Sequence, residues 1–179
     1  MGAVSRVLSV FLRLGQLSCG AIVLGIIGHL FYYVDDASGV GPSGRLVYAA
    51  VIAGLTILAA LIFIAPFAYS FWSFPLDFFL FAAWLVAFSL LETLTRISTC
   101  NSIWFRRYWG FYWGRWYRVA SPGVDVRRTG CAAWRTVLAF SFIAMVLYLL
   151  SAFLVLRHGG HVTIRWKHNR RSHADSVML

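Results

Sequence analysis

Four long apolar runs constrain this chain more than any other feature of its sequence. They cover about residues 14–34, 46–68, 76–97 and 134–156. Each is close to the roughly 20 residues that an α-helix needs to cross the hydrocarbon core of a bilayer. Only 12% of the 179 residues are charged, whereas an average soluble domain has about 25%. We therefore predict an all-α bundle of four transmembrane helices, with both chain ends on one side of the membrane.

The segments between these runs define the predicted organisation. Residues 1–13 form an N-terminal segment, residues 14–156 the transmembrane domain, and residues 157–179 a basic, flexible tail. The connection at 35–45 is rich in Gly, Pro and Ser, which favour turns. A short aromatic turn is expected at 69–75. The first two connections are therefore short, and the third, between the last two runs, is long.

Local patterns refine the expected helices. Pro75 suits the first turn of the third helix, and Asp77 complements the positive end of its dipole. Small residues recur at helical spacing, and small residues let helices approach closely in a membrane. The pairs are Ala21 and Gly25, Ala49 and Ala53, Ala50 and Gly54.

The net charge is +10, and the basic residues lie beside the apolar runs. In that position they orient the spans and contact anionic headgroups, so no nucleic-acid partner is expected. Arginine is similarly frequent on both sides, and counting it does not orient the chain. The first helix usually dominates orientation; Arg6 and Arg13 precede it, and no Lys or Arg immediately follows it. We therefore expect both termini in the cytoplasm.

Two of the three cysteines bracket the segment between the third and fourth runs. With cytoplasmic termini, Cys100 and Cys131 face the lumen or the exterior, where disulfides persist. We predict a bridge that closes a loop of about 30 residues. Two unrelated thiols near the headgroups are the alternative. Cys19 lies inside the first run and is expected to be a small packing residue.

Residues 104–118, WFRRYWGFYWGRWYR, combine aromatic residues with arginine at unusual density. We expect this loop to lie in the membrane interface, with its rings at headgroup depth and its arginines on phosphates. It either anchors the bundle or forms a specific platform for a lipid or partner. The candidate loop residues are Trp104, Arg106, Arg107, Trp109, Trp113, Arg115, Trp116 and Arg118. The candidates for anionic phospholipid in the tail are Arg165, Lys167, Arg170 and Arg171.

Polar residues inside membrane spans are candidates for function. Here they are His29, Glu92 and Arg96. Glu92 and Arg96 lie four residues apart and can neutralise each other on one helix face; a transporter or channel subunit would instead use all three along a polar path. We find no nucleophile–base pair, phosphate-binding glycine loop or metal-ligand cluster. No catalytic, cofactor-binding or metal-binding residue is therefore predicted, and an enzyme is not expected.

Several short motifs follow one another in a characteristic order over about residues 8–165. They are LRLGQL at 12–17, AIVLGIIGHL at 21–30, FPLDFFLFAAWLVAF at 74–88, Cys100, Cys131, Trp134 and AFSFIAMVLYLLSAFL at 139–154. In these the chain resembles the MARVEL-domain family, especially its fungal members. The resemblance implies an M-shaped bundle with cytoplasmic termini, in the plasma membrane or secretory vesicles. It also implies a role in membrane apposition, vesicle traffic or sterol- and sphingolipid-rich domains. The partners expected for the chain are membrane lipids, namely anionic phospholipid, sterol or sphingolipid, and a homo- or hetero-oligomer in the membrane is the further expectation.

Overall fold

The computed structural model describes the backbone of residues 3–36, 41–63, 70–95, 100–113 and 130–177, and the side chains of these residues except at 3–6, 35–36, 70–74 and 155–177. The long helices are α1 (Ala3–Asp36), α2 (Gly44–Phe63), α3 (Ser70–Thr95) and α5 (Cys131–Val177). Each contains a stretch long and apolar enough to cross a membrane. In a helix the backbone N–H and C=O groups bond to one another, and they need no hydrogen-bond partner from the lipid, which offers none. The chain is therefore an all-α, four-span membrane protein, as the sequence predicts.

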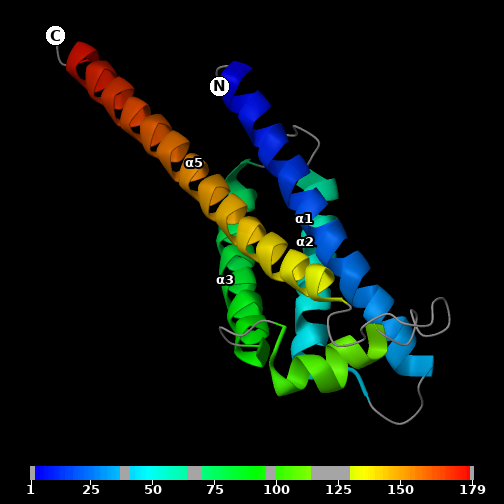
Figure 1. Cartoon of the computed structure of the whole chain (residues 1–179). Coiled ribbons are helices and arrows are strands. Elements are labelled where there is room, and N and C mark those ends of the chain that lie inside the picture. The colour runs from blue at the N-terminus through cyan, green and yellow to red at the C-terminus, as the bar shows by residue number, and fades with distance from the viewer. Residues whose placement is uncertain (1–2, 37–40, 64–69, 96–99, 114–129, 178–179) are drawn as a thin grey trace.

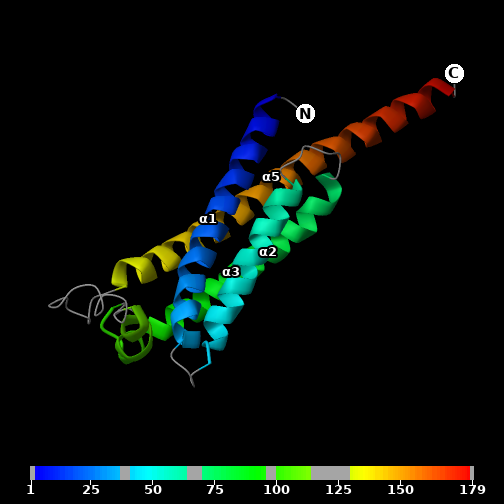
Figure 2. The same ribbon diagram turned by 90° about the vertical axis from the view of Figure 1, so that its right-hand side faces the viewer.

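The four helices form a ring. Helix α1 packs against α2 and α5, and α3 packs against the same two helices. Helix α5 crosses α2 and α3 obliquely in Figure 1 and α1 in Figure 2. Both chain ends lie beyond one end of the bundle, which we call the terminal end (Figures 1 and 2). A short helical segment, residues 103–113, lies across the opposite end, which we call the loop end; it contains the π-helical turn η2 (Phe105–Trp109).

Small residues let α1 and α2 approach closely. Ala49 and Ala53 are fully buried, as expected. A Cβ at Gly20 of α1 would lie only 3.1 Å from the carbonyl oxygen of Ala53, so only glycine fits without a shift of the helices. The other residues of the predicted small pairs are exposed or half-buried: Ala21, Gly25, Ala50 and Gly54. Those two pairs therefore do not form the close helix contacts that the sequence suggested.

Two helices begin earlier than the sequence indicated. Helix α1 continues through Arg13 without a break. Helix α3 begins at Ser70, so residues 70–75 are helical and Pro75 lies inside the helix. Asp77 is consequently about two turns inside α3, where its side chain is fully buried. The interpretation of Asp77 as a helix-start residue was wrong, since it is a core residue.

The remaining boundaries differ by a few residues or more. Helix α2 begins at Gly44 and the described part of it ends at Phe63. The predicted ends of the second and third spans, at 68 and 97, fall outside the described residues. Helix α5 begins at Cys131 and continues to Val177. The backbone of residues 157–177 is therefore helical, where the sequence suggested a flexible tail.

Candidate functional site

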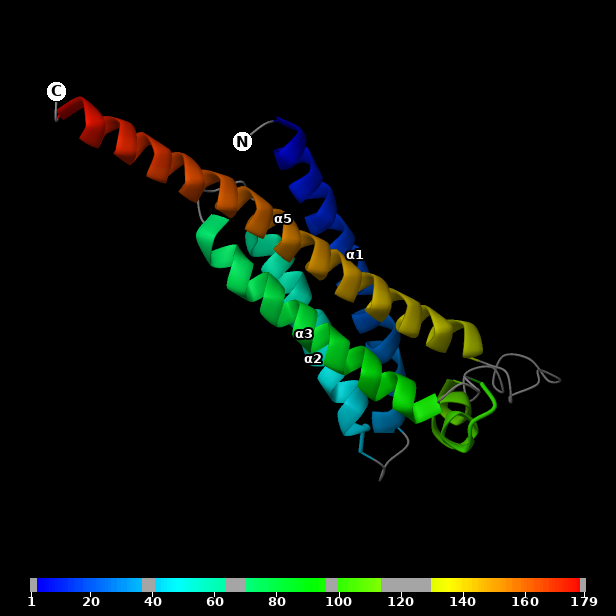
Figure 3. The ribbon, with the colours of Figure 1, turned by 90° about the vertical axis from the view of Figure 1, so that its left-hand side faces the viewer.

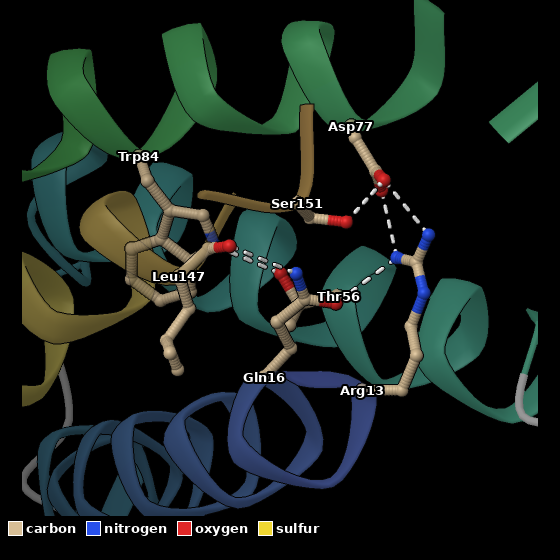
Figure 4. A network of polar contacts seen from close by, with 7 residues as sticks. All are labelled: Arg13, Gln16, Thr56, Asp77, Trp84, Leu147 and Ser151. Atoms are coloured by element: carbon tan, nitrogen blue, oxygen red, sulfur yellow. Dashed lines mark hydrogen bonds and ion pairs between the residues drawn. The ribbon is translucent and has the colours of Figure 1, made fainter. Parts of the chain in front are cut away.

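A buried ion pair joins α1 to α3 toward the terminal end of the bundle (Figure 4). The Nη1 and Nη2 atoms of Arg13 donate hydrogen bonds to Oδ1 and Oδ2 of Asp77 at 2.7 and 2.8 Å. Arg13 is 5% exposed and Asp77 is 0% exposed. Two parallel bonds between a guanidinium and a carboxylate fix the orientation of both groups. The pair therefore presents no net charge to the surrounding lipid.

Further polar groups connect this ion pair to α5. Ser151 Oγ donates to Asp77 Oδ2 at 2.7 Å. Arg13 Nη1 also donates to Gln16 Oε1 at 3.0 Å, and Gln16 Nε2 donates to the carbonyl oxygen of Leu147 at 3.5 Å. Figure 4 shows these groups converging from three helices. The network therefore ties α1, α3 and α5 together at one depth.

Helix α2 meets the same region through two side chains. The guanidinium carbon of Arg13 lies 5.5 Å from the centre of the Phe63 ring, which is within the range of a cation–π contact. Thr56 Oγ1 accepts a hydrogen bond from Trp84 Nε1 of α3 at 2.9 Å. Buried polar groups in a span need such partners, because lipid provides none. All four helices are thus joined by polar or cation–π contacts in this half of the bundle.

This arrangement acts as a structural tie. Both carboxylate oxygens of Asp77 accept hydrogen bonds, and both terminal nitrogens of Arg13 donate them. Arg13 and Asp77 are therefore held in place by each other and by their hydrogen bonds to Gln16 and Ser151. Neither residue was a predicted site residue. The signal that could have identified them is one charge of each sign inside an apolar stretch of two different spans.

The loop end is closed by a covalent bond. Cys100 and Cys131 form a disulfide with a Cα–Cα distance of 5.7 Å, as the sequence predicts. Ser102 follows Cys100 and caps the segment 103–113, because its Oγ accepts a hydrogen bond from the backbone nitrogen of Phe105 at 3.1 Å. The bridge and the cap hold this segment against the beginning of α5. Cys19 is free and buried, also as expected.

The tryptophans of this segment pack into the bundle. Trp109 Nε1 donates to the carbonyl oxygen of Gly130 at 2.9 Å, and its ring lies 4.7 Å from that of Trp134. Trp134 Nε1 in turn donates to Thr95 Oγ1 at 3.1 Å. The Trp104 ring is 5.2 Å from Trp134. Trp109 and Trp134 are fully buried, so their rings seal the loop end, and the Trp109 ring is not exposed to headgroups as expected.

The same segment contacts the ends of α1 and α2. The backbone nitrogen of Ser43 donates to Tyr108 Oη at 3.2 Å. Burial raises the pKa of Tyr108 above its ordinary value, although the bond from Ser43 lowers it, so this hydroxyl stays protonated at neutral pH. The Trp113 ring lies 5.0 Å from His29, which packs 4.9 Å from Tyr33. His29 is exposed on the outside of α1.

The other predicted site residues divide into three groups. Arg106 and Arg107 are exposed, and Glu92 is half-buried on α3. Since His29 is exposed on α1 and Glu92 is half-buried on α3, the structure does not bring these two described intramembrane candidates together along an interior polar path. The remaining residues, or their side chains, lie outside the described part of the chain: Arg96, Arg115, Trp116, Arg118, Arg165, Lys167, Arg170 and Arg171.

Replacing Gly130 by alanine is expected to destabilise the loop end by about 1–3 kcal/mol. Gly130 has a φ of 79°, which a residue with a Cβ adopts only with strain. A Cβ there would also lie 2.8 Å from Trp113 Cγ and 3.0 Å from Trp109 Nε1. Unfolding in mixed micelles would measure the loss. The matched control is Gly25→Ala, since no atom lies within 4 Å of that Cβ; equal losses in both variants would contradict the assignment.

Comparisons of the chain with protein-family models, curated proteins and solved structures found no match. The chain is a multi-pass membrane protein of four spans, joined by a neutral ion pair toward one end and by a disulfide-linked aromatic cluster at the other.

Proposed function

We propose that this protein is a non-enzymatic organiser of membrane regions, which associates with lipids and partner membrane proteins. The observation that carries this proposal is where the charges lie. Among the residues whose side chains are described, the buried charges belong to Arg13 and Asp77, which neutralise each other. The exposed arginines of the segment 103–113, Arg106 and Arg107, lie at the loop end, where lipids or partners can reach them. The helices thus act as a framework, and lipids or partner proteins contact the protein at the two ends of the bundle.

The proposal places both termini in the cytoplasm and the protein in the plasma membrane or the secretory pathway. The Cys100–Cys131 disulfide at the loop end supports this orientation, because disulfides persist in the lumen or outside the cell. The resemblance of residues 8–165 to the MARVEL-domain family supports the same location and role. In this orientation residues 157–177 continue α5 into the cytoplasm for about 30 Å.

Neutralising the tail is the experiment that tests this proposal. Residues 165, 167, 170 and 171 of the extension are basic, and each attracts anionic lipid by about 1 kcal/mol near a surface. We expect the purified protein to be enriched in anionic phospholipid relative to the bulk membrane and to concentrate in patches by single-particle tracking. Replacing all four residues by glutamine should markedly reduce both effects.

The matched control is Arg135→Gln, which removes an exposed charge at the opposite end and should leave both effects unchanged. A wild-type protein that is spread uniformly, with the lipid composition of the bulk membrane and no co-purifying membrane protein, would rule the proposal out.

A further inference from the structure

We infer that one face of the segment 103–113 binds the headgroup of an anionic phospholipid in the leaflet at the loop end. This face, called the headgroup face below, consists of Ile103, Arg106, Arg107 and Phe111. The inference rests on the proposed function and deepens it, since it assigns a lipid class to one defined surface.

The segment has two distinct faces. Phe105, Trp109 and Tyr112 are buried against the bundle. The four residues of the headgroup face are exposed, with Ile103 at 64% and Phe111 at 51%. The faces follow helical periodicity, because positions three or four residues apart lie on one side. The aromatic residues of the inner face therefore fix the segment and leave the arginines free to contact other molecules.

Two contacts define the depth of the segment in the membrane. The hydroxyl of Tyr108 accepts a hydrogen bond from the backbone nitrogen of Ser43, the residue before α2 begins. Trp113 packs against His29, which lies seven residues, or about 10 Å, inside the end of α1 at Asp36. Figures 1 and 3 show the segment lying across the ends of the spans. It is therefore at the level where the helices leave the hydrocarbon, which is the headgroup layer.

The chemistry of the headgroup face fits a phospholipid at this depth. Within the described part of the chain, Arg106 and Arg107 have no ion pair. A guanidinium donates two parallel hydrogen bonds to a phosphate, which makes arginine well suited to phosphodiesters. Ile103 and Phe111 can contact the glycerol and upper acyl chain of the same lipid. An acidic protein would match the charge but would leave this interfacial position unexplained.

The test uses the full-length protein in detergent and native mass spectrometry with added phosphatidylglycerol or phosphatidylcholine. In the mass spectra we expect the wild-type protein to carry bound phosphatidylglycerol in preference to phosphatidylcholine. The double variant Arg106→Gln and Arg107→Gln should bind phosphatidylglycerol more weakly by roughly tenfold or more, since it loses the charge-assisted hydrogen bonds to the phosphate. Arg135→Gln, also exposed at the loop end, is the matched control and should bind like the wild type. Near-ultraviolet circular dichroism would verify that the tryptophan cluster stays folded.

Three outcomes would overturn the inference. They are equal phosphatidylglycerol binding by the double variant and the wild type, displacement of the lipid by the same concentration of inorganic phosphate, and an acidic peptide that competes at this face. Its failure is distinguishable from failure of the proposed function. If only the tail variant loses lipid enrichment, this inference fails and the proposed function stands. If the wild type is spread uniformly, with neither lipid enrichment nor a co-purifying membrane protein, both fail.

Discussion

Replacing Arg13 by leucine is expected to lower the free energy of unfolding by about 3–5 kcal/mol. The variant leaves Asp77, which is fully buried, without the two bonds that balance its charge. An uncompensated charge in a membrane interior is costly, so Asp77 must either take up a proton or draw water into the bundle. Steric trapping or unfolding in mixed micelles would measure the loss, with circular dichroism to verify that the four helices form.

The double variant Arg13→Leu and Asp77→Leu separates the cost of an unpaired charge from the contribution of the pair. Because apolar residues can replace a buried ion pair with little loss, we expect it to recover most of the stability lost in Arg13→Leu. Arg45→Leu is the matched control. Arg45 is exposed and donates one hydrogen bond, to Thr93, so its loss should cost below about 1 kcal/mol. A double variant as unstable as the sum of its single variants would show that the two residues act independently.

Removal of the disulfide is expected to have the second-largest effect, about 3–4 kcal/mol. The bridge links residues that are 31 positions apart and so restricts the unfolded chain. It also holds the aromatic cluster against α5. Cys100→Ser, Cys131→Ser and the double variant should therefore be equally destabilised. Unfolding with and without reductant would measure the effect, and reductant should abolish the difference between wild type and variants.

Cys19→Ala is the control for this series. Cys19 is free and buried, so the variant should keep both the bridge and its response to reductant. Thiol titration of the denatured protein provides an independent check. One free thiol per chain without reductant agrees with a single bridge, whereas three would show that the cysteines are unpaired in the membrane.

The number and order of the spans could be predicted from the sequence, because they depend on local properties. An apolar stretch of about 20 residues must be helical in lipid whatever surrounds it. The Cys100–Cys131 bridge could also be predicted, since the two residues bracket one loop. The start of α3 could not. Pro75 is compatible with either the first turn or the interior of a membrane helix, because neighbouring groups in the bundle can satisfy the freed carbonyl.

The buried ion pair of Arg13 and Asp77 was missed because it depends on contacts between distant parts of the chain. Considered with its neighbours alone, Arg13 is a basic flank and Asp77 an acidic helix start. Only the arrangement of the helices brings them within 2.7 Å across 64 residues of sequence. The buried position of Trp109 was missed for a similar reason. Trp109 looks interfacial by composition, but the carbonyl of Gly130 and the ring of Trp134 provide a buried position for it.

The separation between Arg13 and Asp77 also sets an order of events during synthesis. A ribosome adds about 5–20 residues per second, so Asp77 follows Arg13 by about 3–13 s across the 64 residues between them. In that interval the nascent first helix contains a cation without its partner, which is most stable near water. There Arg13 can serve as the positive flank that directs insertion. The two hydrogen bonds to Asp77 can form only after the third helix has been made, so the contact that closes the bundle comes after the first helix has been inserted.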